Sequence, residues 1–246
     1  MTHCPTHAMI LAAGLGVRLR PITERLPKPL VPVAGRTMLD RVFDHLDQAS
    51  VAHRVVNLHW LGGMIRAHLA GRPGVVFSEE GRLLDTGGGV AKVLPLLGEQ
   101  PFFVCNADVV WRNGAVPALA RLAAAWRDEQ MDALLLLQPT TRAFGYDGPG
   151  DYFLDTLGRA TRRVGRAVSP LVFTGVQILH PRLFAGTPSD PFSLNLLYDR
   201  SQAGERLFGI VHDGEWYHIG TPAGLADAER QLDRRSENGK GRVEET

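Results

Sequence analysis

The sequence predicts an α/β fold: a single domain built on a doubly wound mixed sheet of Rossmann type. Short apolar runs typical of buried strands alternate with segments whose apolar residues recur at helical spacing, which indicates strands joined by crossover helices. The 246 residues suffice for one sizeable core. Hydrophobic residues make up 44% and charged residues 22% of the chain, proportions that are ordinary for a globular protein.

The individual elements follow from these two periodicities. The expected strands are residues 8–13, 54–58, 75–77, 102–105, 133–137, 151–153, 171–179, 207–211 and 215–219. The expected helices are residues 38–46, 61–69, 90–97, 115–126, 192–203 and 222–232, and Thr37 is predicted to cap the first because Asp40 follows three residues later. Residues 1–7 and 236–246 are expected to be flexible or disordered, which leaves 8–235 as the domain.

The most informative stretch follows the first strand, from residue 14 to residue 35. Gly14 and Gly16 permit a turn whose backbone amides form a concave site for an anion, although Gly-x-Gly alone fits a simple tight turn equally well. Arg18 and Lys28 add positive charge, and prolines flank Lys28 on both sides. Neither the dinucleotide fingerprint nor the P-loop is present, since a third glycine and Gly-Lys-Ser/Thr are both missing. The stretch is therefore a candidate cradle for a triphosphate.

Two further segments offer contacts for charged ligands. Residues 85–89 place three glycines before an expected helix, which permits close approach of an anion or serves only as a flexible helix entry. Asp108 follows an apolar strand, and ligands of open α/β sheets bind at the carboxyl ends of strands. A carboxylate beside a bound phosphate suits Mg²⁺, although a strand-end aspartate is more often a turn or capping residue.

Together these motifs resemble the signature of the sugar-phosphate nucleotidyltransferases, which reads Gly-x-Gly-x-Arg, Pro-x-Thr and Pro-Lys-Pro. Here the signature is formed by Gly14, Gly16, Arg18, Pro21, Thr23 and residues 27–29. The resemblance extends from about residue 8 to about residue 232. It implies the GT-A-like mixed sheet of the nucleotide-diphospho-sugar transferases.

The resemblance also implies roles for individual residues. Its catalytic residues would be Arg18, Lys28 and Asp108, and Asp108 would hold Mg²⁺, with Mn²⁺ as an alternative. The nucleotide would be contacted by Ala12, Ala13, Gly14, Gly16, Gly87 and Gly88, with Lys92 facing the same cleft, and the sugar phosphate by Asn106, Asp151, Thr174 and Gly175. His218 stands where the family usually has a second metal-binding aspartate, and its role as a ligand stays open because Mg²⁺ prefers oxygen.

The reaction implied by the resemblance joins a nucleoside triphosphate to a sugar 1-phosphate and releases pyrophosphate. Residues 27–35, 60–62, 86–89 and 94–98 most resemble the uridylyltransferases that act on N-acetylmuramate 1-phosphate in peptidoglycan recycling, so UTP is the favoured nucleotide. The mannose-1-phosphate guanylyltransferases share the signature loop and are the alternative. A non-catalytic nucleotide-sugar sensor or regulatory subunit is a third hypothesis, motivated by His218.

Charge and composition argue against several other classes. A net charge of +1 does not favour a nucleic-acid surface. No apolar run approaches the roughly 20 residues that span a bilayer, and residues 1–7 lack the pattern of a secretory signal. Cys4 and Cys105 are expected in a tail and in a buried strand, so no disulfide is predicted. These features fit a reducing cytoplasm. A monomer or a homodimer is expected, and the sequence does not distinguish them.

Overall fold

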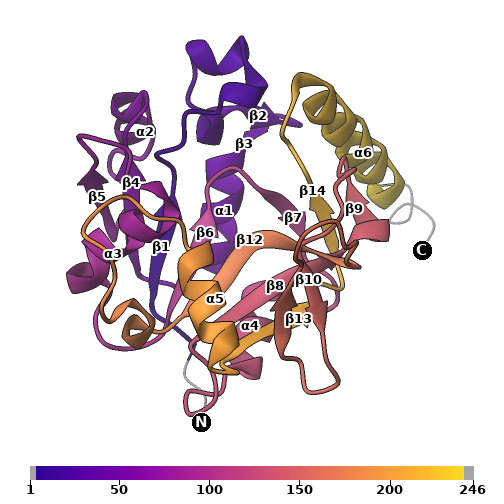
Figure 1. The fold of residues 1–246 in the computed structure, drawn as a ribbon. Helices are drawn as coiled ribbons and strands as arrows, with labels where there is room; N and C mark the ends of the chain where they lie inside the picture. Colours follow the sequence, from indigo (N-terminus) through magenta and orange to yellow (C-terminus); the bar gives the residue numbers. More distant parts are fainter. Residues whose placement is uncertain (1–3, 241–246) are drawn as a thin grey trace.

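A mixed nine-stranded sheet runs through the middle of the computed structural model, which describes residues 4–240 and the side chains of 4–233 (Figure 1). Its strands are β1 (His7–Leu11), β4 (His53–Leu58), β5 (Val75–Glu79), β6 (Phe102–Asn106), β8 (Ala133–Pro139), β10 (Tyr152–Leu154), β11 (Ala160–Arg162), β12 (Leu171–Leu179) and β13 (Leu207–Val211). The order is β11-β10-β12-β6-β1-β4-β5, and β8 pairs with both β12 and β13.

The strand directions create a crevice beside β1. Strands β5, β4, β1 and β6 are parallel, and β12 runs antiparallel to β6 and β8. The chain moves from β1 outward to β4 and β5, and then returns to place β6 on the other side of β1. Such a reversal of strand order opens a binding crevice at the carboxyl ends of the strands.

Helices cover both faces of the sheet because its strands are apolar on both sides. Ile10 and its alternate neighbours along β1 pack against α1 (Met38–Gln48), α2 (Gly62–His68) and α4 (Ala118–Ala125). Met9 faces the opposite way, toward α3 (Asp85–Leu97) and α5 (Asn195–Ala203). Burying one such side chain fully contributes about 1.5–3 kcal/mol, so both layers stabilise the sheet.

A smaller unit holds the loop after β1 against the end of the chain. It contains β2 (Pro32–Val33) paired with β3 (Arg36–Thr37), and the three-stranded sheet of β7 (Val110–Arg112), β14 (Glu215–Tyr217) and β9 (Ala143–Phe144). Leu19, Val31 and Tyr217 are buried in one cluster with residues of α6 (Pro222–Lys240). This packing brings residues 17–31 beside residues 217–220.

The doubly wound mixed sheet and the alternation of elements predicted from the sequence are confirmed. The predicted cap is also present, since the Thr37 hydroxyl oxygen accepts a hydrogen bond from the Asp40 amide at 3.0 Å. Both cysteines, Cys4 and Cys105, are free thiols. Among the described residues, no helix is long and apolar enough to cross a membrane.

Several element boundaries differ from the expectation, and three of these differences concern the glycine segment and the two ends of the domain. Helix α3 begins at Asp85, so the three glycines lie inside its first turns and do not precede it. His7 belongs to β1 and is not part of a tail, while residues 1–3 lie outside the described residues. Helix α6 continues past the expected end at Leu232 to Lys240, so residues 236–240 are helical where disorder was expected. Residues 241–246 are outside the described part of the chain.

Candidate active site

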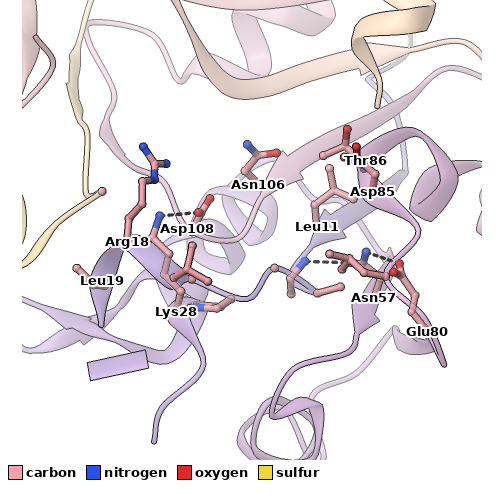
Figure 2. A pocket seen from close by; sticks show the side chains of 18 residues that line it. Leu11, Arg18, Leu19, Lys28, Asn57, Glu80, Asp85, Thr86, Asn106 and Asp108 are labelled. Atoms are coloured by element: carbon pink, nitrogen blue, oxygen red, sulfur yellow. Dashed lines mark hydrogen bonds and ion pairs between the residues drawn. The ribbon is translucent and has the colours of Figure 1, made fainter. Parts of the chain in front are cut away.

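A cavity of about 310 Å³ opens at the carboxyl ends of β1, β4, β5 and β6 (Figure 2). A second cavity of about 210 Å³ adjoins it, and Arg18, Lys28, Asn106 and Asp108 line both. The structure therefore brings the three predicted catalytic residues to the junction of two cavities. The first cavity is also lined by predicted nucleotide-binding residues, namely Ala12, Ala13, Gly14 and Gly16.

The loop after β1 is held in one shape by its own small and polar residues. Gly16 has a φ of +62°, and a Cβ added there would lie 2.9 Å from the Thr23 methyl and 3.1 Å from Cβ of Lys28. The Thr23 hydroxyl donates to the Gly16 carbonyl oxygen at 2.8 Å, and the indole nitrogen of Trp60 donates to the Thr23 carbonyl at 3.0 Å. Gly16 of the signature is thus packed against both its threonine and its lysine. These contacts hold the turn that precedes Arg18 against the start of the Lys28 side chain.

The cationic end of the first cavity is formed by Arg18 and Lys28. The Lys28 ammonium lies 2.6 Å from a carboxylate oxygen of Asp108, and their side chains are 12% and 37% exposed. Arg18 is exposed and has no hydrogen bond or ion pair within the described residues. The positive charge of Arg18 is therefore available to an anion, while that of Lys28 is neutralised by Asp108.

The opposite end of this cavity carries a buried carboxylate that the sequence did not predict. Glu80 is 5% exposed, and its two oxygens accept hydrogen bonds from the Asn57 side-chain amide at 2.7 Å and from the Leu84 backbone amide at 3.0 Å. The Asn57 side-chain oxygen in turn accepts from the Ala12 amide at 2.6 Å. The Ala12 amide, expected to face the nucleotide, is therefore used within the protein. Figure 2 shows the two ends on opposite sides of the cavity.

Gly87 and Gly88 do not line the cavity, contrary to the expectation. Their amides donate to the carbonyl oxygen of Phe192 at 2.9 and 3.1 Å, and a Cβ on Gly87 would lie 2.3 Å from the Phe192 ring. These glycines allow close packing of α3 against the 190–194 segment. The residues just before them, Asp85 and Thr86, line the cavity in their place.

Lys92 also differs from the expectation that it faces this cleft. Its ammonium group donates to the carbonyl oxygen of Glu79, and Lys92 lines neither of the two cavities.

The second cavity collects the residues predicted to bind the sugar phosphate. Asn106, Asp151, Thr174 and Gly175 all line it. Asp151 accepts a hydrogen bond from the Phe173 amide at 2.9 Å, and Gly175, with a φ of +84°, leaves room for Asn106, whose side-chain nitrogen would lie 2.8 Å from an added Cβ. The Thr174 hydroxyl is buried and donates to the Leu136 carbonyl at 2.8 Å, so it is not directed at a ligand as predicted.

His218 lies on the wall of the second cavity with Asp108. Burial lowers the pKa of His218, and the positive charges of Arg18 and Lys28 lower it further, against the opposing effect of Asp108. The imidazole is therefore neutral at neutral pH. Its ring stands edge-on to Tyr146, with 5.8 Å between the ring centroids.

The donor set fits a divalent cation that takes most of its ligands from phosphate and water. The described residues contain no group of three histidine, cysteine, aspartate or glutamate side chains that could hold an ion. Asp108 supplies one carboxylate at the junction of the cavities, with one oxygen already engaged by Lys28. Mg²⁺ is commonly held in this way, by one or two carboxylates together with substrate phosphates.

Comparisons with known proteins agree with this arrangement. The sequence profile described as "Nucleotidyl transferase" matches residues 7–148. The N-acetylmuramate alpha-1-phosphate uridylyltransferase of Caulobacter vibrioides is 42% identical over 94% of this chain and 99% of its own length. The protein of the same name from Neisseria meningitidis is 34% identical over 90% of this chain and 96% of its own length.

Among solved structures, a putative glucose-1-phosphate thymidylyltransferase from Bacillus anthracis has a similar fold. Its TM-score is 0.76 at 18% identity, over 92% of this chain and 94% of that one. The sequence match to the profile covers more than half of the chain, and the two curated relatives extend it over most of the rest. The chain belongs to the nucleotidyl transferase family.

Proposed function

We propose that this protein is a uridylyltransferase that joins UTP to N-acetylmuramate α-1-phosphate, giving UDP-N-acetylmuramate and pyrophosphate. The observation that carries the proposal is the 42% identity to the Caulobacter uridylyltransferase over nearly the entire length of both proteins. The geometry supports it, because Arg18, Lys28 and Asp108 meet at the junction of two cavities, which suits a reaction between two phosphorylated substrates. Residues 8–235 are the proposed catalytic domain.

The charges along the first cavity support one orientation of the nucleotide. Arg18 attracts the triphosphate at one end, and the buried carboxylate of Glu80 disfavours phosphate at the other. The base then lies toward Asp85 and Thr86, and the α-phosphate lies near Asp108. A reversed nucleotide would place several negative charges beside Glu80.

The sugar 1-phosphate occupies the second cavity, with its phosphate at Lys28 and its ring toward Asp151. A phosphate oxygen of the sugar phosphate attacks the α-phosphorus in line, the bond to the β-phosphate oxygen breaks, and pyrophosphate leaves. Lys28 donates one of its three N–H groups to Asp108 and has two others for the incoming phosphate, and Arg18 neutralises charge on the leaving group. Positioning and charge neutralisation suffice, so no protein nucleophile is needed.

Asp108 would hold a Mg²⁺ ion, and Asn106 and the neutral imidazole of His218, which line the same cavity as Asp108, would hydrogen-bond to water on the ion. When bound, the ion would neutralise charge on the phosphate oxygens. Mn²⁺ is the alternative that a nitrogen ligand would favour. Because both proposed substrates are phosphorylated intracellular metabolites, we also propose that the reaction takes place in the cytoplasm.

A pyrophosphate-release assay tests the proposal directly. UTP, GTP, CTP and dTTP are each combined with the 1-phosphates of N-acetylmuramate, N-acetylglucosamine, glucose and mannose. We expect the highest kcat/KM for UTP with N-acetylmuramate 1-phosphate. Turnover of GTP with mannose 1-phosphate alone would favour a guanylyltransferase, and nucleotide binding without turnover of any pair would favour a sensor.

A Lys28→Ala variant separates the two substrates in the same assay. Lys28 is proposed to contact the sugar phosphate, so its loss should raise KM for the sugar 1-phosphate by at least about tenfold, and KM for UTP much less. An unchanged KM for the sugar phosphate would remove Lys28 from that site.

A further inference from the structure

A third cavity, of about 190 Å³, lies beside the proposed sugar site. It is framed by β10, β11, β12 and the start of α5, and its lining consists of Asp151, Tyr152, Arg162, Arg163, Phe173 and Asn195. Asp151 and Phe173 also line the second cavity, so the two cavities are neighbours with a common wall. A substituent of the sugar could therefore extend past Asp151 into this space.

Arg163 is fixed in this cavity without a neutralising partner. Its Nε donates to the Gly150 carbonyl at 2.8 Å, and its Nη1 donates to the carbonyls of Gly165 at 2.7 Å and Ala167 at 3.3 Å. All three partners are backbone carbonyls, and no carboxylate of the described residues lies within ion-pair distance of Arg163. The positive charge of the guanidinium is thus not paired with a carboxylate, and Nη2 has no hydrogen bond in the described part of the chain.

The backbone that holds Arg163 is itself tightly constrained. Gly150 has a φ of +75°, and a Cβ there would lie 2.1 Å from the Ser169 carbonyl oxygen, so only glycine fits this turn. Residues 150 and 165–167 therefore hold the guanidinium in place before any ligand arrives. A preordered arginine loses less conformational entropy on binding, which favours affinity for a carboxylate.

The neighbouring Arg162 provides a contrast within the same cavity. Its Nε and Nη2 both donate to the carboxylate of Asp199, so its charge is already paired. Asn195, the first residue of α5, contributes a side-chain amide at the positive end of a helix dipole. Arg163 supplies the charge and Asn195 a further donor, which together suit a small organic anion.

The proposed substrate carries such a group. N-acetylmuramate differs from N-acetylglucosamine by a lactyl ether on O3 of the ring, and this ether ends in a carboxylate. Resting on the proposed function, we propose that Arg163 is a specificity-determining residue that binds the lactyl carboxylate in the third cavity. Asp151 lines both cavities, and its negative charge repels a carboxylate placed beside it, so the lactyl group is directed toward Arg163. Asp151 instead accepts hydrogen bonds from sugar hydroxyls.

An Arg163→Gln variant tests this proposal with two sugars that differ only in the lactyl group. Hydrogen bonds to charged groups contribute enough to binding that kcat/KM for N-acetylmuramate 1-phosphate should fall by about 10–100-fold. The value for N-acetylglucosamine 1-phosphate should stay within about twofold. Where that sugar is turned over too slowly, its inhibition constant against N-acetylmuramate 1-phosphate replaces kcat/KM.

Two further variants make the result specific. Arg166→Gln removes an exposed arginine from the same loop that lines none of the three cavities, and it should change neither sugar. Arg163→Lys keeps the charge without the planar fork, and it should recover part of the lost selectivity. Equal losses for both sugars with Arg163→Gln, or no loss for either, overturn the proposal. Absence of wild-type turnover with N-acetylmuramate 1-phosphate would instead refute the proposed function itself.

Discussion

An Asn57→Asp substitution tests the buried hydrogen bonds at the base end of the first cavity. The new side chain has the same shape and can still accept from the Ala12 amide, as Asn57 does at 2.6 Å. The change replaces the amide that donates to Glu80 at 2.7 Å by a second carboxylate oxygen. Both side chains are almost fully buried, so water cannot relieve the repulsion.

The magnitude follows from the distance. Two unit charges about 2.7 Å apart repel each other by about 6 kcal/mol at an effective dielectric constant of about 20, so the folded variant will take up a proton between them. Protonating a carboxyl group of ordinary pKa near 4 costs about 4 kcal/mol at neutral pH. We therefore expect a loss of about 3–4 kcal/mol near pH 7, which shrinks by about 1.4 kcal/mol per pH unit as the pH falls.

Urea unfolding of both proteins between about pH 5 and about pH 7.5 measures this difference. The variant should regain stability relative to the wild type as the pH falls, because its folded state binds one more proton than its unfolded state. Adding Glu80→Gln restores a donor opposite the aspartate and should recover most of the loss. A pH-independent difference, or no rescue by the second substitution, would refute the described contact between residues 57 and 80.

The remaining predictions concern the second cavity and the pH dependence of folding. Gly175→Ala should lower the free energy of unfolding by about 1–3 kcal/mol and raise KM for the sugar phosphate, since φ is +84° and the new Cβ would displace Asn106. Gly71→Ala, with φ of +80°, open space around it and no place in the three cavities, controls for backbone strain alone. His218→Asp should lower the Mg²⁺ concentration for half-maximal activity several-fold, because the ion prefers oxygen ligands, and an unchanged requirement would exclude residue 218 from the ion's surroundings. Burial lowers the pKa of His212 from its ordinary 6.5, so the unfolded chain binds more protons below that pH and stability should fall from about pH 7 to about pH 5. His212→Asn should reduce this slope in urea unfolding, and an unaltered slope would count against the buried, neutral state of the ring.

The sheet and the signature loop could be predicted from the sequence because both depend on residues that are close together in the chain. Met9 and Ile10 face opposite layers of helices, so both faces of β1 must be apolar and the strand reads as one continuous run. The contacts among Gly16, Thr23 and Lys28 lie within a short stretch of chain, so the signature records a local structure. A motif of this kind is visible before any fold is known.

The base end of the cavity could not be predicted in the same way. Asn57 and Glu80 come from adjacent strand ends, and their contact depends on the register of β4 against β5, in which Asn57 lies opposite Ser78. The available signal was a polar residue at the end of each apolar strand. Asn106 and Asp108 at the end of β6 were predicted as site residues, and Asn57 and Glu80 were not. The position of Gly87 outside the cavity could not be predicted, because a glycine that approaches a ligand and one that packs against Phe192 have the same sequence pattern.

Local contacts within the loop and a contact between neighbouring strand ends together explain why one end of the first cavity is cationic and the other anionic. The cations Arg18 and Lys28 come from a loop whose shape is set locally, and the buried carboxylate of Glu80 comes from a neighbouring strand end that the sheet places at the far side of the same cavity. A change that weakens only the loop should reduce affinity for the phosphates. A change that removes only the buried carboxylate should instead relax the orientation of the nucleotide. Comparing Glu80→Gln with Arg18→Gln for binding of UTP and of inorganic triphosphate separates these effects: the first should change the ratio of the two affinities, and the second should lower both.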